Sequence, residues 1–352
     1  MSDKKTTYRE HTDMENTLKL RQVLATLPPF CKDYFRAIDT TTTAKTRISY
    51  AYDIRIFFQF LLDENPAFKD HAMTDFTVDV LDQIKAVDIE EYQEYLKLYQ
   101  SGDKTETNGE RGLKRKISAL RSFYAYYYKR EMIHTNPTVL IDVPKIHEKS
   151  IIRLDTDEVA MLLDYIEHCG DTLTGQKRVF YEKTKERDLA IVTLLLGTGI
   201  RVSECVGLDI EDVDFKNNGI KVTRKGGNEM VVYFGPEVEK ALKRYLEVRE
   251  GITPLAGHEH ALFYSAQRKR IGVQAVENMV KKYSRQITTT KKITPHKLRS
   301  TYGTALYQET GDIYLVADVL GHKDVNTTKK HYAALDDARR RQAATAVKLR
   351  EE

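Results

Sequence analysis

The sequence has few cysteines and no apolar segment of membrane-spanning length. Its cysteines are odd in number and far apart, at Cys31, Cys169 and Cys205. They lack the paired spacing of a zinc site or a disulfide framework, which points to a reducing cytosol. The most apolar stretch, 190–196, is far too short to cross a bilayer, and the N-terminus has no apolar signal core. We therefore expect a cytoplasmic protein with no membrane partner.

Strong charge of one sign is also lacking. The formal net charge of +4, with 31% charged residues, is too mildly basic to establish a nucleic-acid partner. The local distribution is more informative, because segment 284–301 has five cations and no Asp or Glu: Arg285, Lys291, Lys292, Lys297 and Arg299. This segment suits a polyanion such as DNA, although an ordinary solvated basic face would explain it equally well.

The length of 352 residues is enough for two domains, each able to bury a core. A short polar segment with a proline, followed by a new helical pattern from Thr156, predicts a linker between them. We predict an N-terminal extension over 1–30, a first domain over 31–143, a linker over 144–152, a second domain over 153–335 and a C-terminal helix over 336–352.

Apolar residues at helical spacing predict several helices in the first domain. The strongest patterns cover 45–62 and 108–129, and a further helix is expected from Asp88, where Glu91 has capping-box spacing. The first thirty residues predict a mobile start and then a short helix over 18–27. The segment 108–129 also has a cationic side that either contacts DNA phosphates or keeps the helix soluble: Lys114, Arg115, Lys116 and Arg121.

The second domain mixes helices with a small sheet. Segments 219–223 and 230–233 alternate in polarity around Gly226 and Gly227, which predicts an antiparallel hairpin. Lys225 would lie near the tip of this hairpin. Arg224 and Lys221 are nearby cations that compete with Lys225 as its functional residue. Segment 171–185 is polar and is expected to be an irregular loop.

A helix start is expected at Thr294 and Pro295, as an N-cap followed by proline in the first helical position. His296 and Arg299, three residues apart, would then share one face beside the positive end of the helix dipole, where an anion is favoured. Taken alone, a His-Lys-Leu-Arg run is most often an ordinary helix start.

Several motifs occur in a fixed order along the second half of the chain. They are Gly197-Thr198-Gly199-Ile200-Arg201-Val202-Ser203-Glu204, then Lys225, then Pro295-His296-Lys297-Leu298-Arg299, then Leu320-Gly321-His322, and finally Tyr332. This ordered set resembles the active site of the tyrosine recombinases. The resemblance extends from about residue 45 to residue 334 and implies a mainly α protein. An all-helical, SAM-like core-binding domain would precede a mostly helical catalytic domain with a small antiparallel sheet, and together they would form a C-shaped DNA clamp.

The residue types suit transesterification at phosphorus, which needs cationic donors around a growing negative charge, a nucleophile and a proton donor. By resemblance, Arg201 and Arg299 clamp the phosphate, and Lys225 protonates the leaving 5′ oxygen. His296 either accepts a proton or donates to a phosphate oxygen, and His322 belongs to the same cluster of donors. Tyr332 is the expected nucleophile, ten residues after His322, an interval one residue longer than in many Xer-type members. Nearby rivals for the nucleophile are Tyr302, Tyr307 and Tyr314. We expect neither a cofactor nor an essential metal ion.

The resemblance is strongest to Xer recombinases that work without a second paralogue. It implies strand exchange through a 3′-phosphotyrosyl ester and a Holliday junction, by a homo-tetramer on two DNA sites, for resolving chromosome dimers. A C-terminal helix over 334–349 would dock on a neighbouring subunit, and an accessory directionality or division protein would act as a further partner. Lys291, Lys292 and Lys297 join the cations listed above as candidate DNA contacts. The alternatives are an integrase of a phage or conjugative element, and a non-cleaving DNA-binding protein on the same fold.

Overall fold

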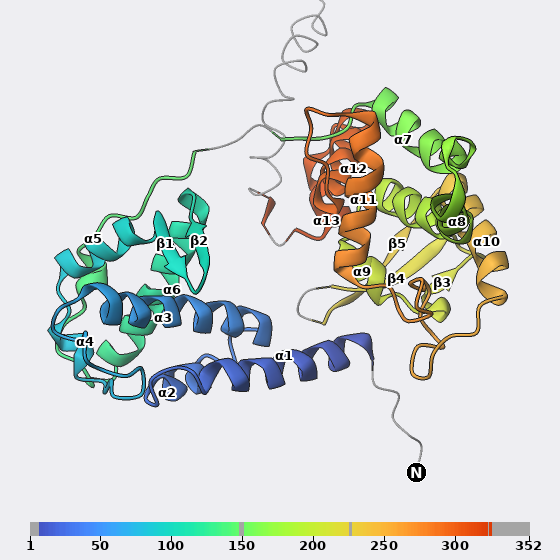
Figure 1. The fold of residues 1–352 in the computed structure, drawn as a ribbon. Helices are drawn as coiled ribbons and strands as arrows, with labels where there is room; N and C mark the ends of the chain where they lie inside the picture. The colour runs from blue at the N-terminus through green and yellow to red at the C-terminus, as the bar shows by residue number, and fades with distance from the viewer. Residues whose placement is uncertain (1–6, 148–150, 225–226, 323, 326–352) are drawn as a thin grey trace, which may run out of the picture. The chain divides into compact units, whose positions relative to one another are not determined.

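The computed structural model describes residues 7–147, 151–224, 227–322 and 324–325. The chain divides into two compact units, residues 1–148 and 149–352, each with helices and one small sheet (Figure 1). Most of the described residues are helical, so the predicted mainly α class is confirmed. In the described part of the chain, no helix is both long and apolar enough to cross a membrane.

The first unit is built around two long helices. Its elements are α1 (Tyr8–Leu24), α2 (Cys31–Ala37), α3 (Ala44–Glu64), α4 (Val80–Gln83), α5 (Ala86–Tyr95), β1 (Leu98–Ser101), β2 (Lys104–Thr107), α6 (Glu110–Tyr128) and the 3₁₀ turn η1 (Pro137–Val139). Helices α3 and α6 match the segments predicted from periodicity. Their apolar faces are buried or partly buried, as expected.

Aromatic side chains fill the space between these helices. The rings of Phe58 and Phe123 meet edge to face with centroids 6.2 Å apart, and Phe30 contacts both. The rings of Phe57 and Tyr124 make a further edge-to-face pair. Because such pairs add about 1 kcal/mol each beyond the area they bury, they help to hold α3 against α6.

Three expectations for this unit are corrected. The N-terminal helix begins at Tyr8, ten residues earlier than predicted, because Thr7 and Glu10 form a capping box. Helix α1 then packs against α3, so it is part of the unit. Helix α5 begins at Ala86, since Asp88 caps the backbone N–H of Lys85 rather than opening the helix itself.

The first unit is also not all-helical. Strands β1 and β2 form an exposed antiparallel hairpin in which Leu98 pairs with Thr107 and Ser101 pairs with Lys104. Apart from Tyr99, which is partly buried, the side chains of these two strands are exposed, so there is no period-two pattern of apolar residues from which to predict them.

The second unit surrounds the long helix α8. Its elements are α7 (Thr156–His168), η2 (Cys169–Thr172), α8 (Gly175–Thr198), α9 (Val202–Gly207), η3 (Ile210–Asp212), β3 (Val213–Asp214), β4 (Gly219–Thr223), β5 (Glu229–Tyr233), α10 (Pro236–Glu250), α11 (Val273–Ile287), α12 (Pro295–Thr310) and α13 (Ile313–Leu320). Helices α7, α10 and α12 pack against α8. Strands β3, β4 and β5 form an antiparallel sheet in that order, so the predicted hairpin is confirmed.

The prediction of an irregular loop over 171–185 is wrong, because α8 begins at Gly175. The segment is polar but rich in Gln, Lys, Arg and Glu, which are good helix formers. Tyr181 fixes it to the preceding helix: its ring is buried, and its hydroxyl lies 2.6 Å from the Glu167 carbonyl and 3.0 Å from that of Ile166.

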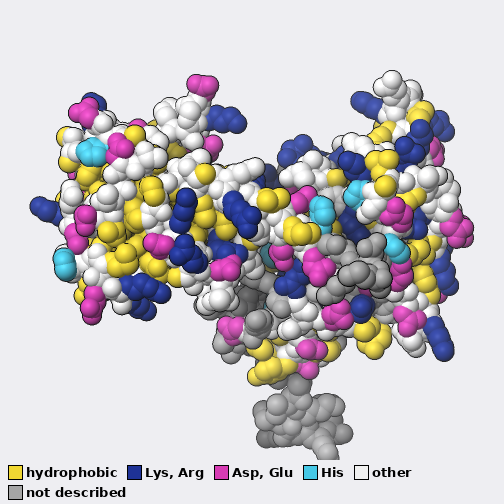
Figure 2. Space-filling model, turned by 90° about the horizontal axis from the view of Figure 1, so that it is seen from below, with side chains coloured by type: hydrophobic (Ala, Val, Ile, Leu, Met, Phe, Trp, Pro, Cys, Tyr) yellow, Lys and Arg dark blue, Asp and Glu magenta, His cyan; other side chains and the backbone are white. Residues whose placement is uncertain are grey.

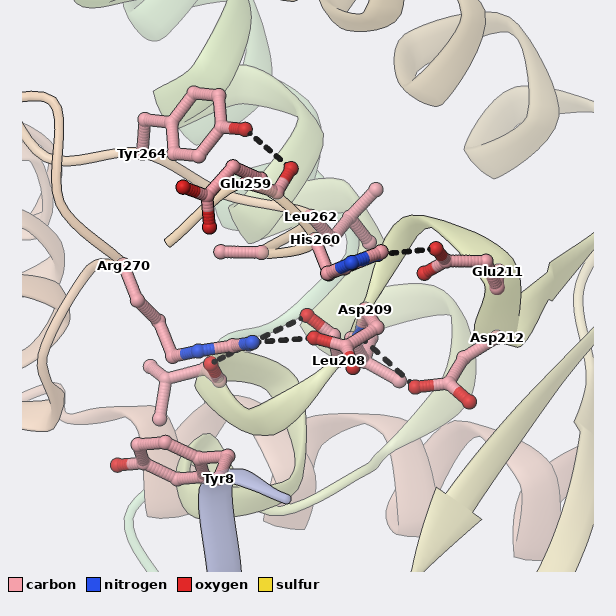
Figure 3. A network of polar contacts seen from close by, with 12 residues as sticks. Tyr8, Leu208, Asp209, Glu211, Asp212, Glu259, His260, Leu262, Tyr264 and Arg270 are labelled. Atoms are coloured by element: carbon pink, nitrogen blue, oxygen red, sulfur yellow. Dashed lines mark hydrogen bonds and ion pairs between the residues drawn. The ribbon is translucent and has the colours of Figure 1, made fainter. Parts of the chain in front are cut away.

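An arginine fixes the chain where it leaves α9 and enters the sheet (Figure 3). Arg270 donates to the carbonyls of Val206 (3.1 Å) and Leu208 (2.7 Å) and forms an ion pair with Asp209. A few residues further on, Glu211 contacts His260. The short helix α9 is therefore held at its C-terminal end by contacts to residues far along the chain.

Asp53 provides the first test of the packing. This carboxylate, 3% exposed on α3, pairs with Arg115 of α6, and the Lys116 ammonium lies 4.0 Å away. Burial raises the pKa of Asp53 to about 6, although Arg115 and Lys116 oppose the shift.

We expect Asp53→Ala to lower the free energy of unfolding by about 3 kcal/mol in urea titrations followed by circular dichroism, because it leaves the buried Lys116 without this carboxylate. Exposed Asp63 on the same helix is the matched control, and Asp63→Ala should change stability by less than about 0.5 kcal/mol. Equal losses from the two variants would contradict this role.

Candidate active site

Helix α13 ends where three of the predicted catalytic residues meet, namely Arg201, Arg299 and His322. Gly321 terminates the helix in the left-handed region, with φ of 61°, and donates to the Asp318 carbonyl, while the His322 N–H donates to the Ala317 carbonyl. The carbonyls of the last turn have no partner within the helix itself, and they carry the negative end of its dipole. The end of α13 therefore favours cations.

Three guanidinium groups contact three successive carbonyls at this end. Arg224 donates to Val319 (2.7 Å), Arg299 donates to Leu320, and Arg201 donates to Gly321 (3.4 Å). They come from the end of β4, from α12 and from the residue before α9. The helix end thus gathers positive side chains that would otherwise repel one another.

Arg201 is held from the other side by Glu204. The two carboxylate oxygens of Glu204 accept from the Arg201 backbone N–H (2.8 Å) and from its guanidinium (2.7 Å). The Glu204 side chain is only 3% exposed, whereas that of Arg201 is 35% exposed. The guanidinium is therefore fixed in direction and still open to solvent, as a phosphate-binding group must be.

Arg299 lies deeper and links two helix ends. It is 5% exposed, and its second donor contacts the carbonyl of Gly199 at 2.7 Å. Gly199 ends α8 in the left-handed region, with φ of 63°, and a Cβ there would lie 2.4 Å from the Tyr302 ring. Both the conformation and the space require glycine at this position.

The two histidines occupy different environments. Helix α12 begins at Pro295 as predicted, with Thr294 before it, but the Thr294 side chain makes no capping hydrogen bond. His296 is exposed in the first turn, while Arg299, one turn further on, is buried. His322 is half-buried and follows Gly321 directly. The structure therefore brings Arg201, Arg299 and His322 to the end of α13.

Two of the remaining predicted catalytic residues lie outside the described part of the chain, whereas the rival tyrosines lie within it. Lys225, Tyr332 and the predicted helix over 334–349 lie outside the described residues. Burial raises the pKa of Tyr302, which disfavours the phenolate that a nucleophile requires. Tyr307 is buried within the second unit, and Tyr314 is 70% exposed.

The candidate DNA-contacting cations divide into two groups. Several contact protein groups: Arg115 and Lys116 face Asp53, Arg121 donates to the carbonyls of Thr138 and Ile141, and Lys291 contacts Asp155 and Glu158. Lys114 and Lys292 are exposed, and Lys297 is half-buried. Acidic and basic side chains both occur on the face of each unit that Figure 2 shows, so charge alone does not mark a DNA interface on this face.

Comparison with known proteins identifies the family. The model of the phage integrase family matches residues 152–339, which is more than half of the chain and includes all six predicted catalytic residues. The chain belongs to this family, the tyrosine recombinases. Among curated tyrosine recombinases, it is 32% identical to XerC of Caldanaerobacter subterraneus subsp. tengcongensis, over 92% of this chain and 88% of that protein. It is 31% identical to XerS of Lactococcus lactis subsp. cremoris, over 90% and 93%.

Solved tyrosine recombinase structures share the fold. XerH bound to its difH substrate, in a pre-cleavage complex, aligns with a TM-score of 0.62 at 21% identity, over 87% of this chain and 80% of that one. The Tn1549 transposon integrase in complex with circular intermediate DNA aligns with a TM-score of 0.63 at 22% identity, over 89% and 98%. The expected recombinase fold is therefore confirmed, and membership of the family confirms the expected enzyme class.

Sequence reasoning missed two residues of this site. Glu204 was part of a recognised motif but had no assigned role, and Arg224 was considered only as a rival to Lys225. The spacing of Arg201 and Glu204, three residues apart at a helix start, was an available signal for the first. Nothing in the sequence indicated that Arg224 contacts the end of α13, 95 residues further along the chain.

Glu204 yields a testable consequence. Glu204→Ala should lower the free energy of unfolding by about 2 kcal/mol, because it removes an acceptor from both the Arg201 backbone and its guanidinium. Calorimetry of the full chain would measure the loss. Glu247→Ala, at an exposed position of α10, should change stability by less than about 0.5 kcal/mol. If Glu204→Ala left the free energy of unfolding unchanged, Arg201 would be held by other groups.

Proposed function

We propose that the protein is a site-specific DNA recombinase of Xer type. The observation that carries this proposal is the convergence of Arg201 and Arg299 on the end of α13, immediately before His322. Such a cluster supplies fixed donors for a phosphate whose negative charge grows during transesterification. The Xer names of relatives that match over nine tenths of the chain favour this type over a mobile-element integrase.

In the proposed reaction, the Tyr332 oxygen attacks phosphorus and forms a 3′-phosphotyrosyl ester. The bond from phosphorus to the 5′ oxygen breaks, and Lys225 gives its proton to that oxygen while Arg201 and Arg299 hold the non-bridging oxygens. The phenolic proton passes to a neighbouring base, for which His296 is the candidate. A 5′ hydroxyl from the partner strand then attacks the ester and releases Tyr332. Because the ester conserves the bond, no nucleotide cofactor is consumed.

We also propose a division of work between the units. The first unit would act as the core-binding domain and the second as the catalytic domain, together forming the predicted clamp on duplex DNA. Two rounds of exchange through a Holliday junction would require a tetramer on two sites. The resemblance to Xer recombinases implies resolution of chromosome dimers as the role, with an accessory division protein as a further partner.

A nicked suicide substrate tests the chemistry. On a duplex carrying a candidate recombination site, in EDTA, the wild type should form a covalent protein–DNA adduct and Tyr332→Phe should form none, because only Tyr332 supplies the attacking oxygen. Tyr314→Phe, at an exposed tyrosine of α13, is the matched control and should react like the wild type. The adducts are resolved on denaturing gels.

The outcomes separate the alternatives. An adduct from Tyr332→Phe would exclude this tyrosine as the nucleophile. Tight DNA binding without any adduct, on sites selected by the protein itself from random duplexes, would favour the non-cleaving alternative. Loss of the wild-type adduct in EDTA would contradict the prediction of metal-free chemistry.

Salt dependence tests the contact with the DNA backbone. If six or more phosphates are neutralised, affinity should fall by about 10³-fold or more between roughly 50 and 200 mM salt. Lys292→Ala should reduce the slope of log affinity against log salt by about 1, since exposed Lys292 is free to meet a phosphate. Lys291→Ala should leave it unchanged, because Lys291 contacts Asp155 and Glu158. Titrations by fluorescence anisotropy would measure both, and a flat response would contradict the clamp.

A further inference from the structure

Arg224 stands where the sheet meets the candidate active site. It follows β4 directly, and its backbone closes the turn of the hairpin: its N–H donates to the Asn228 carbonyl (2.8 Å), and its carbonyl accepts from Gly227 (2.9 Å). The next residue in the sequence is Lys225, the proposed proton donor. Arg224 is therefore the described residue that directly precedes it, and a contact made by Arg224 acts one peptide bond away from Lys225.

The Arg224 side chain is tied to α13. It is 9% exposed, and one terminal nitrogen donates to the Val319 carbonyl at 2.7 Å. The guanidinium lies against Gly321, where an added Cβ would come within 1.4 Å of the other terminal nitrogen. The glycine before His322 is thus required for two reasons, its positive φ and the space that Arg224 occupies.

Burying the charged guanidinium of Arg224 at the end of α13 costs free energy. Burial lowers the pKa of Arg224, Glu204 raises it, and Arg201 lowers it further. The Nε atom and one terminal nitrogen are buried, and neither has a hydrogen-bond partner among the residues that the structure describes. An apolar side chain of similar length would fill the same volume without these costs. General packing is therefore a poor explanation for an arginine here, whereas fixing the hairpin to a carbonyl of α13 is a specific one.

We infer that Arg224 is a positioning residue, which fastens the end of β4 to the C-terminal end of α13 and so sets the hairpin against Arg201, Arg299 and His322. The inference rests on the proposed function, in which the residue after Arg224 protonates the leaving 5′ oxygen. Arg224 acts through its neighbour: losing its tether slows the departure of the leaving group and leaves the binding of DNA unchanged.

The test uses Arg224→Met, which keeps the length of the side chain and removes its donors. On a nicked substrate in single-turnover conditions, cleavage should slow about 100-fold, the low end of what proton transfer contributes, while DNA affinity changes less than about twofold. On a substrate with sulfur in place of the bridging 5′ oxygen, most of this loss should disappear. Sulfur leaves as a thiolate and needs no proton, so a displaced proton donor no longer matters.

Two controls and a second variant keep the result interpretable. Lys225→Ala should show the same rescue by sulfur, and Lys216→Met, at an exposed turn before β4, should cleave both substrates like the wild type. Arg224→Lys retains one donor for the Val319 carbonyl and should recover about tenfold of the lost rate. If Arg224→Met folds poorly, Arg224→Lys still tests the contact to Val319.

The unfavourable results differ from one another. Unchanged cleavage by Arg224→Met, or an equal loss on the oxygen and sulfur substrates, would overturn the positioning role, since the defect would then be absent or would lie elsewhere in the site. If the wild type formed no adduct with either substrate although it bound the DNA, the proposed recombinase chemistry itself would fail. The two failures are therefore distinguishable in one experiment.

Discussion

The candidate active site depends on the carbonyls at the end of α13 that have no partner within the helix itself. A helix end carries about half a negative charge, and here it faces Arg201, Arg224 and Arg299. Each hydrogen bond from a charged donor contributes about 2 kcal/mol, enough to hold like charges close together before any DNA is bound. Preorganisation of this kind is what electrostatic catalysis requires, because the donors do not have to be moved during the reaction.

The rest of the second unit keeps this helix end in place. Two glycines with positive φ, Gly199 and Gly321, end helices that converge on Arg299, and each lies against a side chain that leaves no space for a Cβ. Glu204 fixes Arg201, and Arg270 fixes the passage from α9 to the sheet. The guanidinium groups of Arg201, Arg270 and Arg299 are thus partnered by fixed backbone carbonyls or carboxylates, and the open part of Arg201 is left for a ligand.

The function follows from this site together with the family, and each contributes a different part. Membership of the tyrosine recombinases supplies the reaction class, and the fold is shared with DNA-bound members such as XerH and the Tn1549 integrase. The geometry adds how this chain arranges the arginines that are proposed to bind phosphate, and it shows contacts within the protein for several cations that the sequence offered as DNA contacts. Arg121 and Lys291 are examples.

The sequence by itself determined the long amphipathic helices α3 and α6, the β4–β5 hairpin and the ordered set of candidate catalytic residues. Each of these depends on local spacing or on residue type, which are read directly along the chain. The starts of α1 at Tyr8 and of α8 at Gly175 also have local causes, a capping box and good helix formers, which a search for apolar periodicity overlooks. Only the tertiary structure decided that α1 packs on α3 and that an exposed hairpin precedes α6. It also decided that Arg201 and Arg224 meet α13, because those contacts join residues 120 and 95 positions apart and no local pattern records them.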